Sequence, residues 1–407
     1  MFSWKSGKQQ EKFGGNPMNK KQNYYFQTDL ILLLLAFAII SFLAVYNAQQ
    51  LEQYNTNFLI RQMLFYAIGV GMIASVQFLD LEQLYKTSLY IYIGGIVLLA
   101  FIPISPDFIA REINGAKSWY TFIPGLTLQP AEFVKISTIL FLSAVISKHK
   151  EKYEVSTLKT DIQLLGKLLL YTAIPVFLIM LQPDFGTAMV YLFIVGMLII
   201  LSGINWKIIF SLILSGVAVI ASALFIVIEF PGFAEETLGV QPYQIDRVMT
   251  WFDPSQQSAD ANFHFERSHM ALGSGQLFGK GMGSIEVNYP EAQTDFIFSV
   301  IGESFGFVGS AFVVLLYFML LYKLVTLGLN IYKHSPFGAY FCFGFLSLML
   351  VHVFQNIGMT VGIMPVTGIP LLLISYGGSS VMSTMLGMAV IYRVAVEETI
   401  QNDYLFK

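Results

Sequence analysis

Long apolar runs recur along almost the whole chain of 407 residues. A helix needs about 17 to 25 mostly apolar residues to cross the roughly 30 Å hydrocarbon core of a bilayer. Charged residues make up only 12% of the chain, against about 25% in a typical soluble domain. The sequence therefore predicts an all-α integral membrane protein with about ten transmembrane helices, over residues 30–46, 63–79, 84–104, 131–146, 164–181, 185–201, 208–228, 296–322, 337–361 and 369–394.

The positions of lysine and arginine predict which connections face the cytoplasm, because cytoplasmic segments retain positive charge. With the N-terminus inside, only seven of the 23 Lys and Arg residues fall on the outer side. Ten spans then return the C-terminus to the cytoplasm. The predicted organisation is a cytoplasmic tail over 1–28, one polytopic domain over 29–395 with a large external loop over 229–294 between helices seven and eight, and a cytoplasmic tail over 396–407.

Polar residues gather at the external ends of several spans, although an ionised side chain at the bilayer centre costs at least ~2.5 kcal/mol on insertion scales. In TLQPAEFVKIS, the spacing of Glu132 and Lys135 puts them on adjoining turns of one helix face. In LQPDFGTAM, Asp184 lies in a tight turn, and Asp295 immediately precedes the eighth span with Glu303 about two turns deeper. The sequence therefore predicts a carboxylate-rich external site beside lipid.

Each of these residues also has a purely structural interpretation. Glu132 and Lys135 could be only a buried ion pair that holds helices together. Asp184 could cap the sixth span and Asp295 the eighth, because Asp is favoured at helix N-termini. Glu303 could be a helix-packing contact. Three further polar residues of the ninth span are expected to bond neighbouring helices and are assigned no chemistry: His352, Gln355 and Asn356.

Several function classes are excluded or disfavoured by the sequence. It contains no H-E-x-x-H zinc motif, no P-loop and no G-x-S-x-G elbow. The single cysteine, Cys342, excludes a disulfide framework. With a net charge of −3 and no continuous basic stripe, the chain is not expected to bind nucleic acid.

Six motifs, in order along the chain, resemble those of the SEDS family of shape, elongation, division and sporulation proteins. They are NGAKSWY, LQPAEFVK, QPDFGTAMV, ALGSGQLFGKGMG, TDFIFSVIGESFGFVG and GIPLLLISYGGSS. The stretch FQNIGMTVGIMPVTGIPL is more similar to the elongation branch, RodA, than to the division branch, FtsW. Ala131, where many members have Ser, and Leu372, where a second Pro is common, depart from the pattern and bear on the branch.

The resemblance implies a peptidoglycan glycosyltransferase of the bacterial cytoplasmic membrane. Such an enzyme transfers glycan from a lipid-pyrophosphate-linked donor to a lipid II acceptor on the external face, for cell-wall elongation and cell shape. The aspartate of the family's TDFIF-like motif corresponds to Asp295, which is the candidate catalytic base. The candidate substrate-binding residues are Lys117, Glu132, Lys135, Asp184, Arg247 and Lys280.

The resemblance also implies cofactors and partners. It suggests a divalent cation, Mg2+ or Mn2+, although no ligand spacing in the sequence demands one, and it suggests no organic cofactor. The expected partners are lipid II, the nascent glycan strand, a class B penicillin-binding protein that acts as transpeptidase, and other cell-wall elongation proteins.

Two other functions stay open at the level of sequence. The chain could be a flippase or other transporter of lipid-linked precursors, or a non-catalytic scaffold that recruits cell-wall synthases. Transport favours polar groups near the membrane midplane, often on broken helices. The acidic residues of this chain cluster instead at one side, which favours the polymerase.

Overall fold

The computed structural model confirms an all-α membrane protein. It describes residues 26–51, 57–112, 117–123, 126–237, 245, 259–288 and 290–405. Within these ranges nine helices are long and apolar enough to cross a membrane, and α6 (Phe185–Leu201) is a shorter apolar helix that matches the sixth predicted span. The nine are α1 (Thr28–Gln49), α2 (Phe58–Val76), α3 (Leu81–Phe101), α4 (Pro130–Lys152), α5 (Leu158–Met180), α7 (Trp206–Glu229), α11 (Ile297–Ile331), α12 (Pro336–Thr360) and α13 (Gly378–Leu405).

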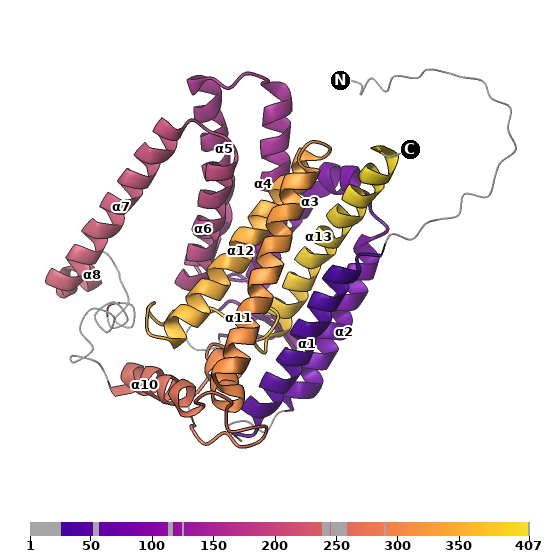
Figure 1. The fold of residues 1–407 in the computed structure, drawn as a ribbon. Coiled ribbons are helices and arrows are strands. Elements are labelled where there is room, and N and C mark those ends of the chain that lie inside the picture. The colour runs from indigo at the N-terminus through magenta and orange to yellow at the C-terminus, as the bar shows by residue number, and fades with distance from the viewer. Residues whose placement is uncertain are drawn as a thin grey trace, which may run out of the picture.

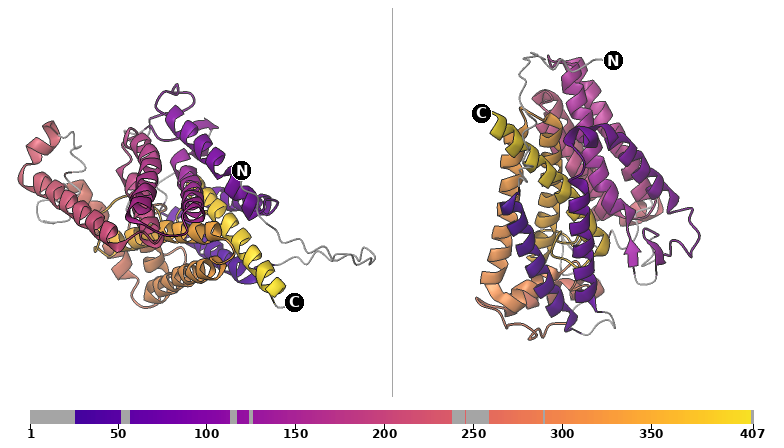
Figure 2. Two further views of the ribbon diagram at one scale, coloured as in Figure 1. Left: turned by 90° about the horizontal axis from the view of Figure 1, so that it is seen from above. Right: turned by 90° about the vertical axis from the view of Figure 1, so that its right-hand side faces the viewer.

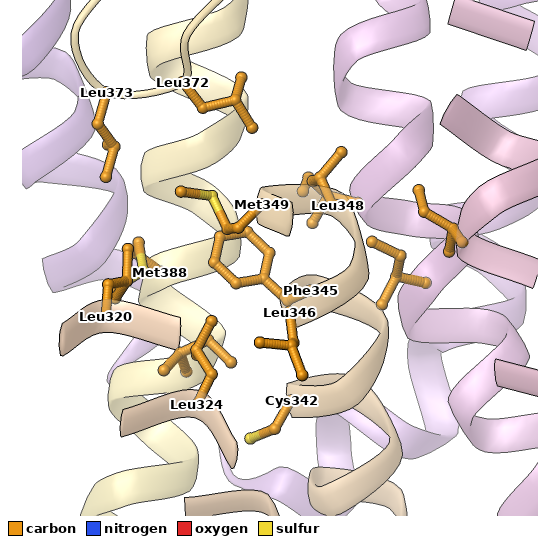
Figure 3. Packing of buried hydrophobic residues seen from close by; sticks show 14 of the residues in the cluster. Leu320, Leu324, Cys342, Phe345, Leu346, Leu348, Met349, Leu372, Leu373 and Met388 are labelled. Carbon is orange, nitrogen blue, oxygen red and sulfur yellow. The ribbon is translucent and has the colours of Figure 1, made fainter. Parts of the chain in front are cut away.

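Three of the long helices form the centre of the bundle. About four fifths or more of the apolar window is buried in α4 (89%), α12 (78%) and α13 (78%), whereas the figure for α7 is 6%. Figures 1 and 2 show α7 at the edge of the molecule, tilted away from the bundle. Figure 3 shows the packing at the centre, where side chains of α11, α12 and α13 interdigitate, among them Leu324, Phe345 and Met388.

Short elements occupy two of the connections. Strands β1 (Tyr120–Ile123) and β2 (Leu126–Leu128) form an antiparallel pair between α3 and α4. The predicted external loop 229–294 contains α8 (Pro231–Glu236) and α10 (Ala259–Ser274). Helix α13 continues without interruption into the predicted C-terminal tail, as far as Leu405.

The apolar segment between α12 and α13 is not helical. Hydropathy predicts a span over 369–394, but α13 begins at Gly378 and the residues before it form turns and irregular backbone. The predicted start of this span is therefore wrong. Gly368 has a φ of 72°, which is outside the helical region, and Pro370 cannot donate a backbone hydrogen bond. Hydropathy measures only the apolar character of these residues and not their backbone preferences.

Side chains from four helices satisfy the backbone of this irregular segment. Backbone carbonyls inside a membrane protein must find donors, since no bulk water is available to them. Six of the seven consecutive carbonyls from Ile369 to Ser375 accept a hydrogen bond from a side chain, and Leu371 O accepts from backbone N–H groups in a turn. The donating side chains are Ser41 of α1, Gln62 and Tyr66 of α2, Tyr317 of α11, and His352 and Asn356 of α12.

Helix α11 is broken at Gly306, where φ is 65° and ψ is −161°. The carbonyls of Glu303 and Ser304 accept from the backbone of 280–281, and the N–H groups of Phe307 and Val308 donate to the carbonyls of 276–277. The loop that follows α10 is therefore inserted into the break. A Cβ on Gly306 would lie 2.4 Å from Gly279 N, so this close approach requires glycine.

The hydrogen bonds to the irregular segment give a prediction about stability. Tyr66→Phe removes the hydroxyl that donates to Leu373 O and leaves a buried carbonyl without that donor. We expect a loss of about 1 to 3 kcal/mol of stability. The measurement is thermal unfolding in detergent, with Tyr90→Phe as control because the Tyr90 side chain is 74% exposed. A Tyr66→Phe protein that melts with the control would contradict the importance of this bond.

Candidate functional site

Asp295 lies in the turn that leads into α11, and this turn is hydrogen-bonded to the irregular segment between α12 and α13. Its backbone carbonyl accepts from Asn356 Nδ2 at 2.7 Å, and the same amide nitrogen donates to Ile369 O at 2.9 Å. The carbonyl of the preceding Thr294 accepts from Ser375 Oγ at 2.6 Å. The backbone on both sides of this position is thus fixed to α12 and to the irregular segment.

The carboxylate of Asp295 lies against Gly368. A Cβ on Gly368 would come within 3.3 Å of Asp295 Oδ2, and Gly368 itself is exposed. The N-cap position of α11, which begins at Ile297, is occupied by Phe296 and not by Asp295, which lies one residue before it. The half-buried carboxylate therefore stands beside a glycine backbone that can be approached from outside the protein.

Asp184 approaches the same segment from α6. Its Oδ1 accepts from Thr187 N at 3.0 Å, which confirms the predicted helix cap, and its Oδ2 accepts from Gln129 Nε2 at 3.1 Å. A Cβ on Gly186, in the first turn of α6, would lie 3.2 Å from Thr367 O. The first turn of α6, which Asp184 caps, therefore packs against Thr367, the residue before Gly368.

Glu132 and Lys135 form the predicted ion pair. Lys135 Nζ lies 2.7 Å from Glu132 Oε1, and the residues are only 2% and 5% exposed. Lys135 Nζ also lies 3.3 Å from His352 Nε2, and His352 Nδ1 lies 2.9 Å from Pro370 O. The pair is therefore connected through His352 to the segment that contacts Asp295.

Lys280 is bound to the break in α11. Its Nζ lies 2.8 Å from Oε1 of the fully buried Glu303 and 3.0 Å from the exposed Glu286. The Glu303 oxygen also accepts from the backbone N–H groups of Glu286 and Val287. The hydrogen bond to Glu303 raises the pKa of Lys280 above its ordinary value, so the lysine stays charged at neutral pH. Glu303 thus acts as a packing contact that holds the external loop.

The two remaining candidate cations are Lys117 and Arg247. Lys117 donates to Ser105 O at 2.6 Å and to Asp107 Oδ1 at 3.2 Å, at the end of α3. Arg247 lies outside the described residues. The structure therefore connects Glu132, Lys135 and Asp295 to one segment, places Asp184 at the start of α6 beside it, and places Lys117 and Lys280 in separate ion pairs.

His352 and Asn356, to which the sequence analysis assigned no chemistry, hold parts of the site together through hydrogen bonds. Asn356 and His352 are four residues apart and so share one face of α12, from which they reach Ile369 O and Pro370 O. Gly368 provides the backbone beside Asp295. The signal for this arrangement is the Gly-x-Pro sequence at 368–370 within an apolar run, which marks a break in regular structure.

The described residues offer no built metal site. Among them, no group of three His, Cys, Asp or Glu side chains gathers in a way that could hold a metal ion. Any divalent cation at these described residues would need further ligands, such as water or the phosphate oxygens of a substrate. The expected Mg2+ or Mn2+ stays a prediction, and no chemical step is assigned to it.

Sequence comparisons place the chain among known proteins. A family model described as "Cell cycle protein", for FtsW, RodA and SpoVE, matches residues 21–400. The chain is similar to the peptidoglycan glycosyltransferase RodA of Treponema pallidum, with 29% identity that covers 90% of this chain and 96% of the relative. It is also similar to the stage V sporulation protein E of Bacillus subtilis, with 30% identity over 90% and 96% of the two chains. A probable peptidoglycan glycosyltransferase FtsW of Hydrogenovibrio crunogenus is 27% identical over 90% and 89%.

Solved structures share the fold. One chain, from work described as "Structural coordination of polymerization and crosslinking by a peptidoglycan synthase complex", matches with a TM-score of 0.73 and 26% identity over 92% of this chain and 98% of its own. The rod shape determining protein RodA of Thermus thermophilus matches with a TM-score of 0.64 and 27% identity over 92% and 97%. The likeness extends over nearly the whole described bundle.

The buried ion pair gives a second prediction. Lys135→Ala leaves Glu132 charged and buried without its cation, which we expect to cost on the order of 3 to 5 kcal/mol. Adding Glu132→Gln should recover part of that loss. Thermal unfolding measures both, and Lys86→Ala is the control because the Lys86–Glu82 pair is exposed. If Lys135→Ala melts like the control but makes no glycan polymer, the lysine serves the substrate and not the fold.

A third prediction concerns the loop inserted into α11. Lys280→Met removes the cation that neutralises buried Glu303, so the loop over 276–288 should be cleaved faster by protease and the protein should melt at a lower temperature. Glu286→Gln is the matched control, because it removes only the exposed partner of the same lysine. A Lys280→Met protein with unchanged melting and protection would show that this ion pair does not hold the loop.

Proposed function

Because the chain belongs to the FtsW, RodA and SpoVE family of cell cycle proteins, we propose that it is a glycosyltransferase that polymerises lipid II into peptidoglycan strands. Relatives named as peptidoglycan glycosyltransferases align with about nine tenths of this chain. Among the described residues, the Asp295 carboxylate lies beside Gly368, and the first turn of α6, which Asp184 caps, packs against Thr367. This arrangement supports chemistry on a membrane-anchored substrate.

The observation that carries the mechanism is the position of Asp295. Its backbone is fixed by Asn356, and its carboxylate lies beside exposed Gly368. A general base must come within hydrogen-bonding distance, about 2.6 to 3.2 Å, of the proton that it removes. The absence of a Cβ on Gly368 leaves space for a sugar hydroxyl to approach the carboxylate.

The reaction is a single displacement at the donor sugar. Asp295 removes the proton from the 4-hydroxyl of the acceptor sugar, and the oxygen attacks the anomeric carbon of the donor. The bond from that carbon to the lipid pyrophosphate breaks, and the pyrophosphate leaves with the bonding electrons. One displacement inverts the anomeric centre, unlike the two-step route through a covalent intermediate.

The leaving pyrophosphate requires cations. Lys117, Lys135, Arg247 and Lys280 remain our candidates for this role. The described lysines among them are each held by a carboxylate, so binding would require a lysine to exchange its partner or to share its other N–H donors with phosphate. A requirement for Mg2+ or Mn2+ can be measured as loss of polymer with chelator and recovery with each ion.

We propose that both termini face the cytoplasm and that the site faces outward. Gln27, just before α1, donates to Thr399 in the last turns of α13 at 2.8 Å, which supports placing both ends on one side. The last turns of α4 carry Lys148, Lys150 and Lys152, which favours a cytoplasmic position for this end of the helix. Glu132, in the first turn of α4, then lies at the external end. The bacterial cytoplasmic membrane follows from the family.

We propose further that the protein serves cell-wall elongation together with a class B penicillin-binding protein. The stretch FQNIGMTVGIMPVTGIPL supports the elongation branch, while relatives carry both RodA and FtsW names. The similar chain in a peptidoglycan synthase complex supports a partner. Restoration of rod shape in RodA-depleted cells, but not of division in FtsW-depleted cells, would support this branch. Co-purification with a transpeptidase under mild detergent tests the partner.

The test of function is glycan-strand formation from labelled lipid II by the purified protein. Asp295→Asn keeps the shape of the side chain but removes its basic oxygen, so polymer formation should fall by at least about 10²-fold, as is typical of a lost general base. Melting and lipid II binding should be unchanged. Asp403→Asn is the matched control, since Asp403 is exposed near the end of α13.

Three results would contradict this account. Polymer at a near-normal rate from Asp295→Asn would exclude Asp295 as the base. Movement of labelled lipid II across vesicles by the wild-type protein, without polymer, would indicate a transporter. Absence of both activities in the wild-type protein, together with recruitment of an active synthase, would indicate a scaffold.

A further inference from the structure

His352 is a buried residue of α12 whose two ring nitrogens contact different parts of the site. It is 1% exposed. Nε2 lies 3.3 Å from Lys135 Nζ, and Nδ1 lies 2.9 Å from Pro370 O. The ring therefore connects the Glu132–Lys135 ion pair to the irregular segment after α12.

The neighbours of His352 determine which nitrogen carries the proton. The ammonium group of Lys135 can only donate hydrogen bonds, so Nε2 must accept. A neutral imidazole then carries its proton on Nδ1, which donates to Pro370 O. Glu132 holds the ammonium at 2.7 Å from its own oxygen. The buried ion pair therefore fixes the tautomer, and the tautomer fixes the bond to Pro370.

The bond to Pro370 lies two residues from the position that contacts Asp295. Asn356, one turn further along α12, holds Ile369 O, so the two side chains grip consecutive carbonyls. Gly368, which comes next toward Asp295, has a left-handed φ of 72° and is not held by helical hydrogen bonds. Without the bond to Pro370, Asn356 alone would hold the backbone that follows Gly368, so Gly368 would be fixed less tightly relative to the Asp295 carboxylate.

We propose that His352 is a positioning residue for the polymerase reaction: through its Nδ1 bond to Pro370 it holds Gly368 at the distance from Asp295 at which the acceptor hydroxyl is activated. The proposal rests on the proposed function of Asp295. Lys135 serves in it as the group that orients the histidine ring. Neither side chain needs to contact the reacting atoms for this role.

Three variants separate the two bonds of the ring. His352→Asn places an amide N–H near the position of Nδ1 and can keep the bond to Pro370. His352→Gln places an amide near Nε2 and can keep the contact with Lys135, and His352→Ala removes both. The matched control is His149→Ala, because His149 is also buried, at 5% exposure, and lies 3.5 Å from a lysine, Lys167, far from the site in the last turn of α4.

The measurement is the initial rate of glycan formation at several lipid II concentrations. We expect kcat to fall at least about tenfold in His352→Ala and His352→Gln with KM changed less than twofold, because misplacement by about 1 Å can cost up to 10²-fold. His352→Asn should recover kcat to within about threefold of wild type, and His149→Ala should match wild type. Recovery by Gln and not by Asn, or wild-type kcat in His352→Ala, would overturn the proposal.

A double variant distinguishes positioning from a general loss of structure. If His352 acts through Asp295, then His352→Ala in the Asp295→Asn protein should lower the residual rate by less than twofold, since the base is already absent. A full tenfold further loss would overturn the proposal. The proposed function fails separately, when Asp295→Asn itself retains the wild-type rate.

Discussion

The structure depends on the satisfaction of a stretch of non-helical backbone inside the membrane-spanning bundle. Between Ile369 and Ser375 the carbonyl groups have no helical partners, apart from one turn, and lipid offers none. Six side chains from α1, α2, α11 and α12 supply the hydrogen bonds. Because four helices must be in place for these bonds to form, the packing of the bundle fixes the position of the segment and hence of Gly368.

The charged groups near the site are arranged in pairs, because a charge, like a backbone carbonyl, needs a partner where water is excluded. Buried charge without a partner is strongly unfavourable, so Lys135 is matched by Glu132 and Lys280 by Glu303. These pairs hold two irregular parts of the chain, the segment after α12 and the loop inserted at Gly306. The two ion pairs thus help to hold irregular backbone near the proposed site in one conformation.

Local chemistry made much of this architecture predictable from the sequence. Run length predicts the helices, the Asp184 cap follows from Asp before an apolar helix, and the contact of Glu132 with Lys135 follows from their three-residue spacing. The predicted start of the last span is wrong because hydropathy does not distinguish an apolar helix from an apolar irregular segment. The contacts of His352 and Asn356 with residues 369–370 are tertiary, and polar residues in a helix give no indication of which backbone they will meet. The insertion of 276–281 into the break in α11 is also a tertiary contact. Among its sequence features, the glycines at 279 and 306 are the ones that indicate a close approach of two backbones.

The central claim is that the Asp295 carboxylate, held beside Gly368, is the group that meets the acceptor hydroxyl. The most direct measurement is an experimental structure of the Asp295→Asn protein with lipid II bound as acceptor. The account predicts the 4-hydroxyl oxygen of the acceptor sugar at about 2.6 to 3.2 Å from the side chain at position 295, over the exposed face of Gly368. An acceptor hydroxyl that instead lies against Glu132 or Glu303, with position 295 turned away, would contradict it.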